Sequence, residues 1–132
     1  MYTSKQVCDQ VGISYETLKF YCKEGLVPNV KRDKNNYRKF DEKNISWLKG
    51  IQCLRKCGMS IKDIKVYMNY CLEGQSTIPE RKEMLDKSKA FLLKQIEEIS
   101  ESINFINSKQ AFYDDVLSGK IKYTSNLIDV ED

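Results

Sequence analysis

The chain has 132 residues, with 22 Lys and Arg against 19 Asp and Glu, a formal net charge of +3 and no histidine. The missing histidine and the lack of a Gly-rich phosphate loop, a Ser–His pairing or a paired-carboxylate site argue against an enzyme, a cofactor or a metal site. No apolar run is long enough to cross a bilayer and no charged-then-apolar leader is visible, so we expect a cytoplasmic protein, neither secreted nor membrane-anchored.

The first 25 residues predict two short helices joined by a tight turn. Thr3 and Gln6 have the spacing of a capping box for the first helix, and Gly12 is placed to end it. Ser14 can cap a second helix over residues 15–24. Two helices separated by a few residues that include Gly are the helix-turn-helix signature.

The second helix carries side chains suited to DNA. Leu18 and Cys22, one turn apart, are placed to hold it to the core. The remaining positions supply hydrogen-bond donors, a cation and aromatic edges: Tyr15, Thr17, Lys19, Phe20 and Tyr21. We expect this helix to lie in a major groove of DNA.

A cationic segment follows at residues 31–40. Its Lys and Arg side chains suit phosphate binding because they neutralise phosphates and displace condensed counterions, and Asn35 and Asn36 at its centre tolerate the left-handed backbone of a hairpin turn. Basic residues outnumber acidic ones 14 to 8 over residues 1–74, but are outnumbered 8 to 11 over residues 75–132. This imbalance indicates that a nucleic-acid partner binds the first part of the chain. The alternative is that the cationic segment is only a solvated loop.

The middle of the chain predicts a second pair of helices. Asp41 can cap a helix over residues 42–56, and Ser60 can cap the next one. After a polar break, Thr77 and Glu80 have capping spacing for a helix that continues without Gly or Pro to about Leu117.

The long helix has the pattern of a coiled coil. Apolar side chains repeat every seven residues, with two more placed four residues later: Leu85, Leu92, Ile99, Ile106 and Tyr113, then Ile96 and Ile103. One such seam cannot bury itself in so small a chain, so we expect self-association; the alternative is a single helix folded back on its own head. A second row, Phe91, Phe105 and Phe112, is expected to pack on the head or the tail rather than on a cofactor.

Linked motifs along residues 1–113 resemble the MerR family of bacterial transcription regulators, closest to its short aldehyde- and thiol-stress-sensing branch. They are Tyr2-Thr3, Thr17-Leu18-Lys19-Phe20-Tyr21, Gly25-Leu26-Val27-Pro28, Asn36-Tyr37-Arg38, Gly58-Met59-Ser60 and Thr77-Ile78-Pro79-Glu80-Arg81. One departure is Lys19-Phe20-Tyr21, where the family usually has Arg-Tyr-Tyr or Arg-Phe-Tyr. Lys cannot make the bidentate fork of Arg, so the bases that this helix reads are left open.

The resemblance implies a mainly α-helical fold: a winged helix-turn-helix DNA-binding head with a small β-hairpin wing, then a long antiparallel coiled-coil dimerisation helix. The expected division is a head at 1–74, a linker at 75–79, the coiled-coil helix at 80–117 and a short tail at 118–132. It also implies a homodimer in the bacterial nucleoid that bends and untwists a palindromic promoter so that RNA polymerase can use it. Activation and repression are both open, as is a constitutive architectural role without an inducer.

The candidate DNA-binding set combines the second helix, the wing and two cations of the second helix pair. By resemblance, Arg55 and Lys62 are placed to touch phosphate, although both can be merely exposed. The full set is Thr3, Tyr15, Thr17, Lys19, Phe20, Tyr21, Lys31, Arg32, Lys34, Asn36, Tyr37, Arg38, Arg55 and Lys62.

Five cysteines form an odd set without a Cys-x-x-Cys pair, so we expect neither a disulfide framework nor a zinc module. Cys53 resembles the single cysteine of the aldehyde-sensing branch, and Lys49 and Lys56 lie close to it in the sequence. It lies on a face of small residues that we expect against the coil. The alternatives are that Cys53 is a small buried core residue, or that the regulator responds to metal, although residues 72–132 contain no cysteine.

Overall fold

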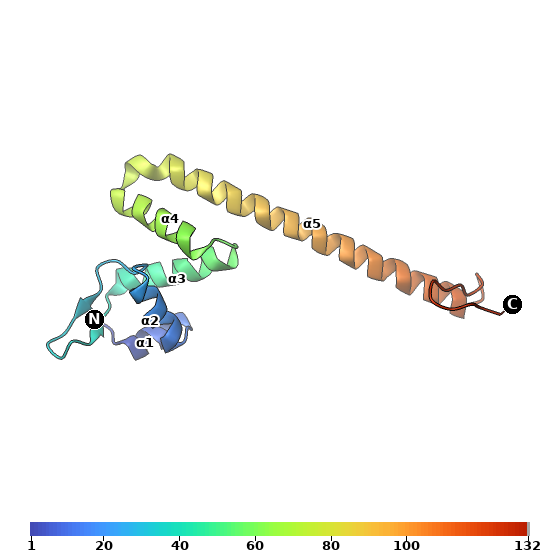
Figure 1. The fold of residues 1–132 in the computed structure, drawn as a ribbon, viewed down its shortest axis with the longest axis horizontal. Helices are drawn as coiled ribbons and strands as arrows, with labels where there is room; N and C mark the ends of the chain where they lie inside the picture. Colours follow the sequence, from blue (N-terminus) through green and yellow to red (C-terminus); the bar gives the residue numbers. More distant parts are fainter. Residues whose placement is uncertain (132) are drawn as a thin grey trace. The chain divides into compact units, whose positions relative to one another are not determined.

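The computed structural model describes residues 1–131 and is mainly helical (Figure 1). Its elements, in chain order, are α1 (Ser4–Val11), α2 (Tyr15–Lys23), β1 (Lys31–Arg32), β2 (Arg38–Lys39), α3 (Glu42–Lys56), α4 (Ile61–Glu73), the 3₁₀ turn η1 (Gln75–Thr77) and α5 (Ile78–Leu117). The expected fold class is confirmed: a helix-turn-helix, a two-stranded antiparallel hairpin, a second helix pair and a long C-terminal helix.

The helices of the head begin and end where local hydrogen bonding dictates. The Thr3 side chain accepts from Gln6 N and the Gln6 side chain accepts from Thr3 N, a complete capping box. Ser14 and Asp41 cap α2 and α3 through their side-chain oxygens. Gly12 ends α1 with the left-handed backbone, φ +78°, that glycine adopts at no steric cost.

One apolar core joins the helices and the hairpin of the head. Its fully buried side chains come from α1, α2, the 25–30 loop, the end of the hairpin, α3 and α4: Val7, Leu18, Leu26, Phe40, Leu48, Ile51 and Ile64. Trp47 Nε1 donates to Leu26 O at 2.6 Å, and its ring stacks on Tyr67 at 6.4 Å between centroids. This bond ties α3 to the loop that follows the helix-turn-helix.

The turn into α5 is held by a polar network. The buried Thr77 hydroxyl lies 2.8 Å from Gly74 O and accepts from Arg81 Nε at 3.1 Å, while Arg81 Nη2 donates to Gly74 O. These bonds satisfy the carbonyl group of Gly74, the C-cap of α4. The spacing of Thr77 predicted that it caps the long helix, but its hydroxyl instead bonds to the end of α4. The long helix α5 begins at Ile78, inside the expected 75–79 linker.

Contacts divide the chain into two compact units, Met1–Leu92 and Leu93–Asp132, with the boundary inside α5. The first unit thus includes the start of α5, beyond the head boundary at residue 74 that the sequence suggested. Phe91 anchors this segment: its ring packs so closely on Gly58, in the turn between α3 and α4, that an added β-carbon there would stand 2.6 Å from it. The expectation that Phe91 packs on the head is confirmed.

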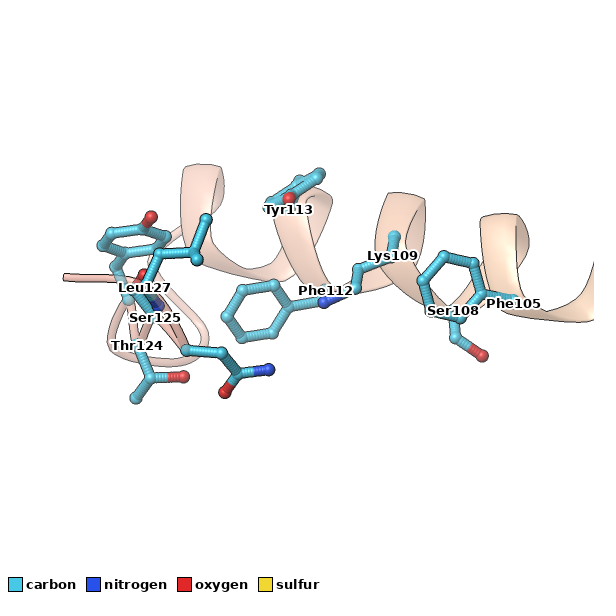
Figure 2. Close-up of a pocket in the computed structure, with 10 residues that line it drawn as sticks. Phe105, Ser108, Lys109, Phe112, Tyr113, Thr124, Ser125 and Leu127 are labelled. Carbon is cyan, nitrogen blue, oxygen red and sulfur yellow. The ribbon is translucent and has the colours of Figure 1, made fainter.

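In the second unit, the tail returns over the end of α5. The Phe112 ring lies 6.4 Å from that of Tyr123, so Phe112 packs on the tail as expected. Phe105, Ser108, Lys109, Phe112 and Tyr113 of α5, with tail residues 123–127, line an open hollow of about 520 Å³ (Figure 2).

The Gly58–Phe91 contact yields a stability prediction. In Gly58→Ala the new β-carbon would stand 2.6 Å from the Phe91 ring, at a φ of +83°. Left-handed backbone costs a non-glycine residue about 1–2 kcal/mol, and overpacking adds about 1–3 kcal/mol. We expect a clearly lower free energy of unfolding in a denaturant titration.

Gly12→Ala is the matched control, because Gly12 has a similar φ of +78° and an added β-carbon there would meet nothing within 4 Å. It should show only the backbone cost. Equal destabilisation by the two substitutions would contradict the Phe91 packing.

Candidate DNA interface

The outward face of α2 is a stripe of exposed side chains at positions i, i+3, i+4 and i+7. Glu16, Lys19, Phe20 and Lys23 form this stripe, and Tyr15 borders it with 53% of its surface exposed. The opposite side, with Leu18, is buried in the core. Because the core fixes the rotation of the helix, this stripe is the face that α2 can present to a groove.

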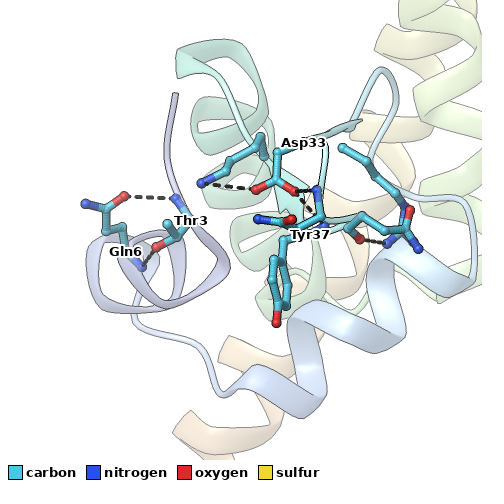
Figure 3. A network of polar contacts seen from close by, with 8 residues as sticks. Thr3, Gln6, Asp33 and Tyr37 are labelled. Carbon is cyan, nitrogen blue, oxygen red and sulfur yellow. Dashed lines mark hydrogen bonds and ion pairs between the residues drawn. The ribbon is translucent and has the colours of Figure 1, made fainter.

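Three members of the candidate set, all from the helix-turn-helix, hold the fold rather than face outward from α2. Tyr21 is 8% exposed and belongs to the core, and Thr3 uses its hydroxyl in the capping box of α1 (Figure 3). Thr17 is half-buried, with Oγ1 2.9 Å from Ser14 Oγ, the cap of α2. These three side chains position the helices; of the predicted α2 residues, Tyr15, Lys19 and Phe20 are exposed.

The wing is a short hairpin whose turn is organised by Asp33. Lys31 pairs with Lys39 and Arg32 with Arg38 across the two strands. Asp33 Oδ1 accepts from Asn35 N at 2.8 Å and from Tyr37 N at 3.0 Å (Figure 3). Asn36 has φ +66°, so the expected left-handed turn residue is confirmed.

The wing cations differ in whether they bond to other groups of the wing. Arg32 Nη1 donates to Asn36 O at 2.8 Å, and Lys39 Nζ lies 3.9 Å from Asp33 Oδ2. Lys31 and Lys34 are exposed and make no ion pair within residues 1–131. Tyr37 is 70% exposed at the tip. The exposed lysines and Tyr37 are therefore the wing side chains most available to a ligand.

A hollow of about 420 Å³ lies beside α2 at the second helix pair. Glu16, Thr17, Phe20 and Tyr21 line it from α2, and Arg55 and Ile61 from α3 and α4. Arg55 Nη1 donates to Met59 O at 3.0 Å, which holds the guanidinium near the turn, whereas Lys62 is exposed on the first turn of α4. The candidate set drawn from the sequence omitted Glu16, although its spacing from Lys19, Phe20 and Lys23 marks it as part of the exposed stripe.

The cysteines fall into different environments. Burial raises the pKa of the Cys8 and Cys22 thiols above its ordinary value, which favours the protonated form. Cys53 is exposed, which contradicts the alternative of a buried core residue in the single chain. Near it, a β-carbon on Gly50 would meet only the ring of Trp47, at 4.0 Å. All five cysteines are free, and the described residues contain no cluster of three or more His, Cys, Asp or Glu that could hold a metal ion.

The arrangement of α1, α2, the hairpin and the α3–α4 pair defines a winged helix-turn-helix regulator head. The family model of the MerR HTH family regulatory proteins matches residues 2–71. The chain belongs to this family. Within the described part, no helix combines the length and apolarity needed to cross a membrane.

Relatives and solved structures agree with that assignment. The chain is 40% identical over 112 residues to an HTH-type transcriptional regulator of Haemophilus influenzae, covering 85% of this chain and 83% of the relative. It is 39% identical to the HTH-type transcriptional regulator AdhR of Bacillus subtilis over 80 residues, 61% of this chain and 57% of AdhR. Its fold is similar to that of HiNmlR, described as a MerR family regulator lacking the sensor domain and bound to promoter DNA, with a TM-score of 0.73, 38% identity and coverage of 89% and 93%.

Substitutions should separate phosphate contacts from base contacts. Lys34→Ala removes an exposed wing cation, so affinity for all DNA sequences should fall alike and the slope of log K against log salt should decrease by about one. Lys19→Ala, on the exposed face of α2, should change which bases are preferred. Fluorescence anisotropy with several duplexes at several salt concentrations measures both; the same change in base preference for both variants would refute this division.

Proposed function

We propose that this protein regulates transcription by binding a palindromic promoter site as a homodimer, with α2 in a major groove and the wing on adjacent phosphates. The observation that carries the proposal is the exposed stripe of α2 on the same core as a wing with exposed cations. The likeness to HiNmlR, bound to promoter DNA, supports it. The proposal includes no enzymatic activity and places the protein on nucleoid DNA in the bacterial cytoplasm.

Within this proposal, the chain divides into four parts. Residues 1–74 form the DNA-binding part, 75–79 the link, 80–117 the dimerisation helix and 118–132 the tail. The side chains offered to DNA are those of α2, the wing and the second helix pair: Tyr15, Lys19, Phe20, Lys31, Arg32, Lys34, Asn36, Tyr37, Arg38, Arg55 and Lys62. Thr3, Thr17 and Tyr21 belong to the interface through the elements that they hold in place.

Self-association is supported by the seam of α5. Its central side chains Ile96, Ile99 and Ile103 are 60%, 59% and 51% exposed in the single chain. The seven-residue row of the seam is also symmetric about Ile99: Leu92 and Ile106 stand seven residues to either side, and Leu85 and Tyr113 stand fourteen. An antiparallel pair with its two-fold axis at Ile99 therefore places the members of this seven-residue row opposite one another along a helix of 40 residues, roughly 60 Å.

The seam can be tested with a charge at its centre. Ile99→Lys would bury a cation beside its symmetry mate without a counter-ion, which costs several kcal/mol. The variant should sediment as a monomer and lose tight binding to a palindrome, because the half-sites are then bound independently. Glu101→Lys, on the outward side of the same helix turn, is the control and should remain dimeric. Persistence of the Ile99→Lys dimer would contradict the proposed interface.

Cys53 is the residue proposed to sense electrophiles such as aldehydes. Its exposure supports access by a reagent, and its neighbours Ser46, Gly50 and Cys57 leave a face of small side chains that a paired helix can approach closely. An adduct there would push two packed elements apart. The similarity to AdhR over 80 residues is consistent with this proposal.

Cys53→Ser should fold, dimerise and bind DNA like the parent, but a reporter promoter should no longer respond to aldehyde. Cys57→Ser, one turn away, should retain the response. Full induction of the Cys53→Ser variant would place the sensor elsewhere. Reporter output that stays constant for the parent under aldehydes, oxidants and metals would instead favour a constitutive architectural binder or repressor.

A further inference from the structure

Glu16 is the one acidic side chain on the outward stripe of α2. It is exposed, in the first turn of the helix, and shares the stripe with Lys19, Phe20 and Lys23. In helix-turn-helix proteins the N-terminal residues of the recognition helix contact base edges. The end of the stripe that is placed to read bases therefore carries a carboxylate.

A carboxylate at this position has few favourable partners on DNA. Phosphates repel it, and it forms no ion pair within 4.0 Å among residues 1–131. In the major groove the available donors are the N4 amine of cytosine and the N6 amine of adenine. The adenine amine stands beside the N7 acceptor of the same base, which repels a carboxylate, whereas the neighbour of the cytosine amine on its own base is a C–H group.

We propose that Glu16 determines specificity by accepting a hydrogen bond from the N4 amine of a cytosine in each half-site. This inference rests on the proposed function, because it requires α2 to lie in a major groove. Repulsion by the phosphates lowers the affinity for all other sequences. The same side chain therefore raises the affinity for a site with one particular base and lowers the affinity for non-specific DNA.

Two structural roles compete with base reading. An acid in the first turn stabilises a helix through its dipole, and Glu16 also lines the hollow that Arg55 borders, so it could orient that guanidinium. The dipole role predicts a change in thermal stability without a change in base preference. The Arg55 role predicts a uniform change in affinity and in salt dependence.

The test is Glu16→Gln in the full-length chain, with preferred sites selected from random duplex DNA. Glutamine makes a bidentate pair with adenine N6 and N7. At one position in each half-site the preference should change from cytosine to adenine, symmetrically in the two halves. Affinity for the parent's site should fall about tenfold, while affinity for unrelated DNA should rise, because one negative charge near the phosphates is removed.

Glu24→Gln is the matched control. It makes the same charge change at an exposed position at the opposite end of α2, and should leave the selected sequence unchanged. If Glu16→Gln selects the same sequence as the parent, or changes all affinities equally, the Glu16 inference is overturned while the proposed function stands. If the parent protein itself selects no palindromic site, both the Glu16 inference and the proposed function are overturned.

Discussion

Burial of Phe40 fastens the wing to the helical head, and the DNA-facing surface depends on that attachment. Each strand of the wing has only two residues, too few for a hairpin to be stable alone. Phe40, directly after β2, is fully buried and pairs through both backbone groups with Tyr2 at 2.7 and 2.9 Å. The wing therefore shares its core with α2 through Leu18, so the two elements can act on DNA as one surface.

The same surface separates positioning from recognition. Asp33 accepts the backbone N–H groups that shape the wing turn, and Arg32 binds the Asn36 carbonyl, so both are engaged in holding the hairpin. Lys31 and Lys34 carry charge that the turn does not use. Phosphate contacts of this kind set orientation without reading sequence, which leaves base discrimination to the exposed stripe of α2.

The start of α5 is part of the head unit for two physical reasons. Phe91 occupies the space that only a glycine at position 58 leaves open, and Arg81 bonds to the Gly74 carbonyl at the end of α4. The apolar seam beyond Leu92 is exposed in the single chain. The start of α5 is therefore held on the head unit, and most of the seam of the proposed dimer lies beyond that contact.

The sequence alone determined the features that depend on short-range hydrogen bonds and backbone angles. The capping box of Thr3 and Gln6, the left-handed Asn36 and the seven-residue repeat of α5 were readable because each involves residues a few positions apart. The tertiary structure decided which side chains are buried in the core and which are exposed. It turned Tyr21 inward, left Glu16 and Cys53 outside, and directed Thr77 to α4, because these outcomes depend on contacts between elements distant in sequence.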